Sequence, residues 1–460
     1  MERNKLQEYF KDRVLELLNY KTIDTYRVRS HNAYTLLVEL RDLIVGWGEN
    51  KIKLFETIIL CIEEVIYSIK KDACLDFDFY NKETFLSDIE NYSKTKGEKY
   101  SESRTILMTI NKCIDYNEYK YLPNLFSSIE SQIFGDDIIQ EKDFSPEIEK
   151  LDYKISSLCC SLIHIGYSKH HLYNTFKSLF KMSDFNKAYC KLKEEYTTPK
   201  SKQYTVVLKL SSLPQSITTA DLPELVSDFE FDSGNNAMVE AYLKLKKHER
   251  LYVVHNCIAM DTQTATKKAV GCMNTYLDSL QLVVNNLKIG VPKKALVILG
   301  SYVHLSSTDY KFDGVYSNDI TLVKPFKKYL ERILKNQFIE KGVKVRIDSA
   351  LRHLRVGNSS EELEQRFINY WIALEFLFSS PESTETTFNR IKKFLPTILT
   401  TCYVKRNLYA LNQCLVNNNL LMSGDLYWEK NDMDQYINNV NSILWKYKLK
   451  LMKSRIFYRA

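Results

Sequence analysis

The chain has 460 residues, 45% of them hydrophobic, and this length exceeds what one ordinary core organises, so we expect two or three domains. The net charge of +7 is modest, which excludes a uniformly basic nucleic-acid-binding chain, and the ten cysteines form no C-x-x-C pair, which excludes a zinc ribbon or a disulfide framework. Glycine (13) and proline (9) are few for this length, so helices should dominate over strands.

The sequence also lacks the common targeting and cofactor motifs. No apolar run is long enough to span a bilayer, and no signal peptide follows Met1, so we expect a cytoplasmic protein with no membrane contact and reduced thiols. There is no G-x-G-x-x-G, no P-loop and no H-E-x-x-H. Dinucleotide and P-loop chemistry therefore have no support, and we expect no cofactor and no metal site.

Residues 1–200 are predicted to form a helical N-terminal region. Apolar side chains recur at helical spacing over residues 34–44 and 54–66. Ser168 is a suitable N-cap for a helix that begins at Lys169. The polar stretch 197–202 is the expected linker to the next part of the chain.

Residues 201–325 are predicted to form a small α/β module. The segments 204–210, 251–259 and 295–303 are β-branched or alternating and predict strands. Between the last two, Asp261 can cap a helix whose apolar face includes Ala269, Met273 and Leu277.

Residues 326–460 are predicted to be helical again, which makes the fold class mainly α. The capping-box spacing of residues 359–362 opens a helix that runs to Phe378. A further helix begins at Phe388, and the last one is amphipathic and basic, with six cations and no acidic residue between Lys446 and Arg459. Two interpretations of that basic run stay open: contact with phosphate groups, or a solvated face that complements the helix dipole.

Glu375 is the residue of this region that composition does not explain. It follows Ile368 and Trp371 and precedes Phe378 at spacings of three and four, which predicts that it points to the apolar face of its helix. A buried carboxylate needs a cationic partner, and Arg455 or Arg459 would serve. The alternative is that Glu375 lies at the edge of the stripe and reaches water.

The segment from Ala350 to Leu377, with its W-I-A-L-E core at 371–375, and the later Tyr403-Val-Lys-Arg406 resemble the Apea-like branch of the HEPN domain family. The resemblance covers about the last 130 residues. Arg455-Ile-Phe-Tyr-Arg459-Ala460 is similar to the opening of the family's R-I-Y-R-x-R-N-x-x-V-H motif.

This resemblance implies a helical bundle that pairs with a second copy and cleaves RNA without a metal. Its catalytic Arg and His would follow residue 460, so they are not in this sequence. Glu375 would orient that Arg, while Arg455 and Arg459 would support the pair or contact phosphate. Lys446, Lys450 and Lys453, together with these two arginines, are the predicted nucleic-acid-binding residues.

Two internal stretches share the bare Arg/His spacing, Arg250 with His255 and Arg346 with His353, although neither stands where the family has its motif. Two functions remain in view. One is an RNA-cleaving effector of an antiviral or toxin-type defence system, with RNA (transfer RNA among the candidates), a homodimer or higher oligomer, and a regulatory protein as expected partners. The other is a non-catalytic HEPN-like module that binds a nucleic acid or a protein, so enzymatic activity is left open.

Overall fold

A computed structural model describes residues 3–19, 31–95, 100–135, 144–213, 217–219, 222, 224–226, 228–231, 237–247, 249–283, 293–308, 328, 332, 335–360, 363–379 and 385–400. The chain divides into two compact units, Met1–Gly314 and Val315–Ala460. The first contains the region predicted as 1–200 and residues 201–314 of the region predicted as 201–325. The mainly helical fold class is confirmed, because helices prevail and the described strands form one small antiparallel sheet.

The N-terminal part of unit 1 is built from helices. They are α1 (Arg3–Leu18), α2 (Ala33–Gly48), α3 (Glu56–Lys71), α4 (Lys82–Lys94), α5 (Tyr100–Asn117), α6 (Tyr121–Phe134), α7 (Phe144–Ile165), α8 (Lys169–Leu179) and α9 (Phe185–Thr197). Helix α2 packs against α3 and α5, and α1 packs against α7. Aliphatic residues that recur every three or four positions supply the core, among them Leu37, Leu40, Ile58 and Val65, which are buried.

Polar side chains fix how some of these helices meet. Asn32 caps α2 by accepting from the Thr35 backbone N–H, and its amide donates to the Ser157 carbonyl and the Ser161 hydroxyl on α7. Arg13 on α1 is 2% exposed and donates to Asp152 on α7 at 2.6 Å and to Glu16 at 2.9 Å. A buried cation is stable only with such partners, so this ion pair fixes α1 against α7.

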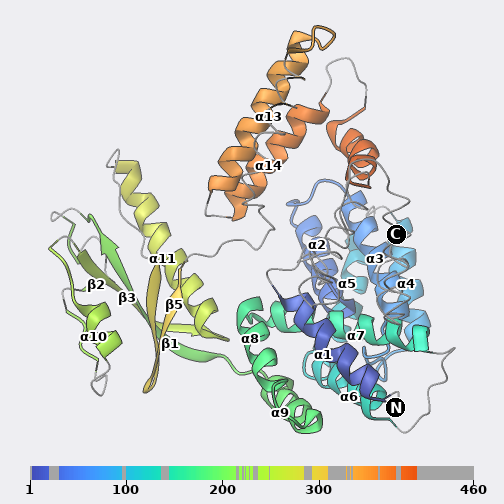
Figure 1. Cartoon of the computed structure of the whole chain (residues 1–460). Coiled ribbons are helices and arrows are strands. Elements are labelled where there is room, and N and C mark those ends of the chain that lie inside the picture. Colours follow the sequence, from blue (N-terminus) through green and yellow to red (C-terminus); the bar gives the residue numbers. More distant parts are fainter. Residues whose placement is uncertain are drawn as a thin grey trace, which may run out of the picture. The chain divides into compact units, whose positions relative to one another are not determined.

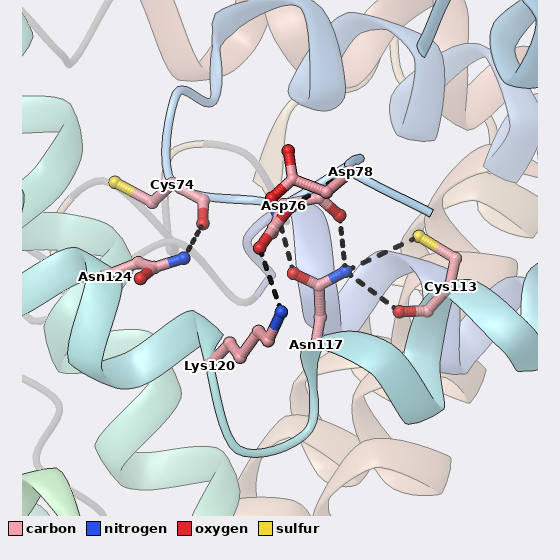
Figure 2. A network of polar contacts seen from close by, with 7 residues as sticks. All are labelled: Cys74, Asp76, Asp78, Cys113, Asn117, Lys120 and Asn124. Carbon is pink, nitrogen blue, oxygen red and sulfur yellow. Dashed lines mark hydrogen bonds and ion pairs between the residues drawn. The ribbon is translucent and has the colours of Figure 1, made fainter. Parts of the chain in front are cut away.

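A second polar network, drawn in Figure 2, holds the connection between α3 and α4. Asn117, fully buried at the end of α5, accepts from the Asp76 backbone N–H at 2.8 Å and donates to the Asp76 carbonyl at 2.9 Å and the Cys113 carbonyl at 3.0 Å. Lys120 adds an ion pair, with its Nζ 3.3 Å from Oδ2 of Asp76. The loop is therefore tied to the α5–α6 connection by hydrogen bonds that leave the amide satisfied.

The second part of unit 1 contains the sheet. Its strands are β1 (Lys202–Ser211), β2 (Leu225–Val226), β3 (Glu249–Ala259), β4 (Lys294–Leu299) and β5 (Tyr302–Ser307), in the order β2-β3-β1-β4-β5. All neighbouring pairs are antiparallel. The predicted single strand over 295–303 is wrong: it is a hairpin, because Gly300 takes a positive φ of 57° and reverses the chain between β4 and β5.

Each face of the sheet has its own apolar cluster. Helix α11 (Thr262–Val283) covers one face with Ala265, Ala269, Met273 and Leu277, and Figure 1 shows it lying beside the strands. On the other face Val207, Val253 and Leu296 pack with Val239 of α10 (Ala237–Leu243). Successive side chains of β1 point to opposite faces of the sheet, so alternate residues of this strand belong to the two different clusters.

The described part of unit 2 is chiefly a helical hairpin, drawn in orange in Figure 1. It consists of α13 (Lys341–Ser359) and α14 (Leu363–Phe378). Residues 387–400 are also helical. The predicted end of the helix at Phe378 is confirmed. Gly357 permits the close approach of the two helices, since a Cβ at that position would lie 2.7 Å from Cε1 of Tyr370.

Candidate functional site

The hairpin of α13 and α14 contains the segment that carries the family resemblance, and its interior is polar at the centre. His353 of α13 and Asn369 of α14 meet there, with His353 Nδ1 and Asn369 Oδ1 3.0 Å apart. Asn369 is 9% exposed, and its amide nitrogen donates to the Gln365 carbonyl at 2.8 Å. Its oxygen must therefore accept from His353, which places a hydrogen on Nδ1 of the histidine.

That hydrogen bond and an aromatic contact together orient the His353 ring. The ring stacks on Phe376, with centroids 5.7 Å apart and an interplanar angle of 19°. Because Nδ1 carries the hydrogen, the lone pair of the neutral ring is on Nε2. His353 is half-buried, so the hairpin holds an imidazole of fixed orientation that is partly accessible to solvent.

The predicted partner of His353, Arg346, serves a different purpose. Its guanidinium donates to the carbonyl of Ser379, just past the end of α14, and Arg390 donates to the adjacent Phe378 carbonyl at 2.7 Å. Both cations thus satisfy carbonyls that have no partner within the helix and complement the negative end of its dipole. Arg346 and His353 share the side of α13 that contacts α14, but the arginine acts as a helix cap.

The other internal Arg/His pair is not brought together. Arg250 and His255 both lie on β3, where five residues of extended chain separate them by roughly 16 Å. Arg250 donates to the Glu249 carbonyl, and His255 is exposed. This pair cannot act on one bond.

Glu375 is exposed, so of the two alternatives the structure has the one in which it reaches water. Its Oε1 accepts from Trp371 Nε1 at 2.8 Å, one turn earlier on α14. The expectation that it points to a buried face is wrong. The face that α14 buries is centred on Asn369 and Ala373, and Glu375 lies two residues, or roughly 200° around the helix, from Ala373.

The cationic residues predicted near the C-terminus, Lys446, Lys450, Lys453, Arg455 and Arg459, lie outside the described residues. The structure therefore gives no contact between Arg455 or Arg459 and Glu375. The predicted nucleic-acid-binding stretch and its relation to the hairpin stay predictions.

A cationic face that the sequence reasoning missed lies on α13. Lys341, Lys344, Arg352 and Arg355 fall within an arc of roughly 80° on the helix, with Asp348 as one acidic residue among them. Lys341, Arg352 and Arg355 are exposed and Lys344 is half-buried, and none forms an ion pair with a carboxylate of the described chain. The four cations follow one another at spacings of three, eight and three residues, and this pattern in the sequence indicates a common helix face. The face extends about 21 Å along the helix axis.

These features allow specific chemistry. The cationic face of α13 can contact a polyanion, and the oriented imidazole of His353 can accept a proton. Within the described ranges, no group of three or more His, Cys, Asp or Glu side chains is arranged to hold a metal ion. None of the described helices is long and apolar enough to cross a membrane.

Comparisons with known proteins add no assignment. No protein-family model, no curated protein and no solved structure matches this chain.

Proposed function

We propose that unit 2 is a HEPN-like domain and that the protein is a metal-independent, RNA-cleaving effector of an antiviral or toxin-type defence system. The observation that carries the proposal is the antiparallel pairing of α13 and α14, in which the W-I-A-L-E helix places Glu375 on an exposed surface. A carboxylate in that position can bind an arginine that approaches from another helix or from a second copy of the chain.

The reaction would be attack of a ribose 2′-hydroxyl on the adjacent phosphate. The 2′-oxygen would form a cyclic phosphate with the same ribose, and the bond from phosphorus to the 5′-oxygen of the next nucleotide would break, so that this oxygen leaves as a hydroxyl. A histidine would transfer the protons and an arginine would stabilise the charge that develops on the phosphate oxygens, each contributing a factor of about a hundred or more. Glu375 would orient that arginine, and Arg455 and Arg459 would support it or bind the neighbouring phosphate. The substrate is RNA, with transfer RNA among the candidates, and the active species is a homodimer or higher oligomer under the control of a regulatory protein in the cytoplasm.

The cationic face of α13 supports the RNA part of this proposal. Four cations without carboxylate partners in the described chain, spread over about 21 Å, can neutralise successive phosphates of a single strand. Each phosphate contact should contribute about 0.7 to the slope of log affinity against log salt for single-stranded RNA.

The test is induction of the full natural reading frame in cells, followed by electrophoresis of total RNA and transfer RNA. We expect RNA fragments with the wild-type protein and a loss of cleavage with Glu375→Gln. Glu364→Gln, an exposed position in the first turn of the same helix, is the matched control and should cleave normally. Intact RNA in the presence of folded wild-type protein would refute the nuclease.

The alternative is a non-catalytic HEPN-like module that binds a nucleic acid or a protein, and the same cationic face favours the nucleic-acid version. Replacing Lys341, Lys344, Arg352 and Arg355 by alanine should then weaken RNA binding at low salt and flatten its salt dependence. Lys392→Ala, at an exposed position in the helical residues 387–400, should leave both unchanged. Binding that did not weaken with salt would count against phosphate contact in either function.

A further inference from the structure

Unit 1 contains a cavity that the proposed nuclease function does not use. It has a volume of about 440 Å³ and lies where the last helices of the N-terminal part meet the sheet. This volume is within the range of about 300–1,000 Å³ that is typical of small-molecule sites. Its lining combines aromatic side chains with charged ones.

The inner wall of the cavity is aromatic. Tyr167 is 8% exposed and stacks on His171, with centroids 5.8 Å apart and an interplanar angle of 10°. Tyr204 of β1 is 3% exposed, while Tyr302 at the start of β5 is 57% exposed and forms the outer edge. Burial raises the pKa of Tyr167 and of Tyr204 to about 12, so both hydroxyls remain donors at neutral pH.

The rim of the cavity carries charges of both signs that do not pair with one another. Glu194 and Glu195 belong to the last turn of α9, and Lys200 and Lys202 follow it. None of the four side chains forms a hydrogen bond or an ion pair with another residue in the part of the chain that the structure describes. Lys200 and Lys202 are separated by one residue, and both line the cavity.

Asp261, the other carboxylate of the lining, is already fully used. It is 2% exposed and accepts from the Ser168 backbone N–H at 2.6 Å, the Ser168 hydroxyl at 3.0 Å and the Gln263 backbone N–H at 2.9 Å. It also accepts from the backbone and hydroxyl of Thr264. The groups free to bind a ligand are therefore the rim charges and the aromatic faces.

We propose that this cavity binds a nucleotide. The base lies against the Tyr167 and Tyr302 rings, the phosphate binds Lys200 and Lys202, and the carboxylate of Glu195 accepts a hydrogen from the amino group of the base. A planar aromatic body with an anionic end and a polar donor edge matches the aromatic wall, the two lysines and the glutamate together. An apolar ligand would leave all four rim charges unused.

Isothermal titration of the whole chain with adenosine 5′-monophosphate tests this assignment, with adenosine and ribose 5-phosphate as the two partial ligands. We expect the complete nucleotide to bind at least about tenfold more tightly than either part. The Lys200→Ala/Lys202→Ala double variant should weaken nucleotide binding by about tenfold or more and leave adenosine binding unchanged. Lys191→Ala, exposed on α9 and outside the cavity, is the control and should bind as the wild type does.

A second variant separates the aromatic contribution from folding. Tyr302→Ala removes a side chain that is mostly exposed, so the thermal midpoint should stay near that of the wild type while the nucleotide and adenosine both bind more weakly. No binding of the nucleotide at about 1 mM would overturn the proposal. Equal affinity for nucleotide and adenosine, or an unchanged affinity in the double lysine variant, would overturn it as well. The outcome is independent of whether unit 2 cleaves RNA.

Discussion

Asp261 connects two helices that are far apart in the sequence, and replacing it by asparagine should break only one of the two connections. Its carboxylate caps α11 through the Gln263 and Thr264 backbone N–H groups and also binds Ser168, the N-cap of α8. Asparagine is as good an N-cap as aspartate, so its one carbonyl oxygen can keep the cap of α11. Its amide group would then face the Ser168 N–H, donor against donor.

The magnitude follows from the group that loses its partner. The Ser168 backbone N–H, which donates to Asp261 at 2.6 Å, would be left unsatisfied in a partly buried position at a cost of about 1–3 kcal/mol. Local opening at the start of α8 should therefore become roughly tenfold to a hundredfold more frequent. Hydrogen exchange followed by mass spectrometry should show this acceleration in peptides that cover residues 166–172, and much less in those that cover the first turn of α11.

The control is Asp184→Asn, since Asp184 caps α9 through the Lys187 backbone N–H at 3.2 Å and is exposed. It should not affect exchange at α8. If Asp261→Asn left α8 unchanged, or opened the first turn of α11 as much as that of α8, the inference that one carboxylate bridges the two helices would be refuted.

Three further predictions concern unit 1. Arg13→Met should lower the free energy of unfolding by about 3–5 kcal/mol, because it leaves the Asp152 carboxylate without its buried cation; urea denaturation followed by circular dichroism measures this. Adding Asp152→Asn to this variant should recover part of the loss. Burial lowers the pKa of His171, so the folded state holds this side chain neutral and loses stability as the pH falls below 6.5, where the unfolded chain binds the proton. His171→Gln should therefore make the thermal midpoint depend less on pH in that range. Burial raises the pKa of the thiols of Cys61, Cys113 and Cys159 to about 12 and that of Cys74 to about 11. Iodoacetamide at pH 8 should therefore label the exposed Cys190 and Cys272 before these four buried cysteines. Faster labelling of the buried cysteines would contradict the fold.

Local chemistry made several elements predictable from the sequence. Ser168 and Asp261 were expected to cap helices, and both do so, because an N-cap depends on a side chain and backbone groups two or three residues away. The hydrogen bonds that join these two residues span 93 positions and leave no local pattern. The same limit applies to His353 and Asn369, which meet only because α13 and α14 pack in one particular register. The hairpin of β4 and β5 did have a signal, Gly300, which stands in the turn between two strands that together appear as one apolar run.

Glu375 shows why helical spacing alone does not decide burial. A helix as apolar as α14 offers more than one stripe, and the stripe of Ile368, Trp371 and Phe378 is only one of them. Contact with α13 selects the stripe of Asn369 and Ala373 instead, and Ile368 is 49% exposed. Two helices can bury only one face each against the other, so a hairpin of this composition gains too little from burial to be stable by itself. Functional tests of Glu375 and of the α13 cations should therefore use the whole chain, in which a lost activity can be attributed to the altered side chain and not to unfolding of an excised hairpin.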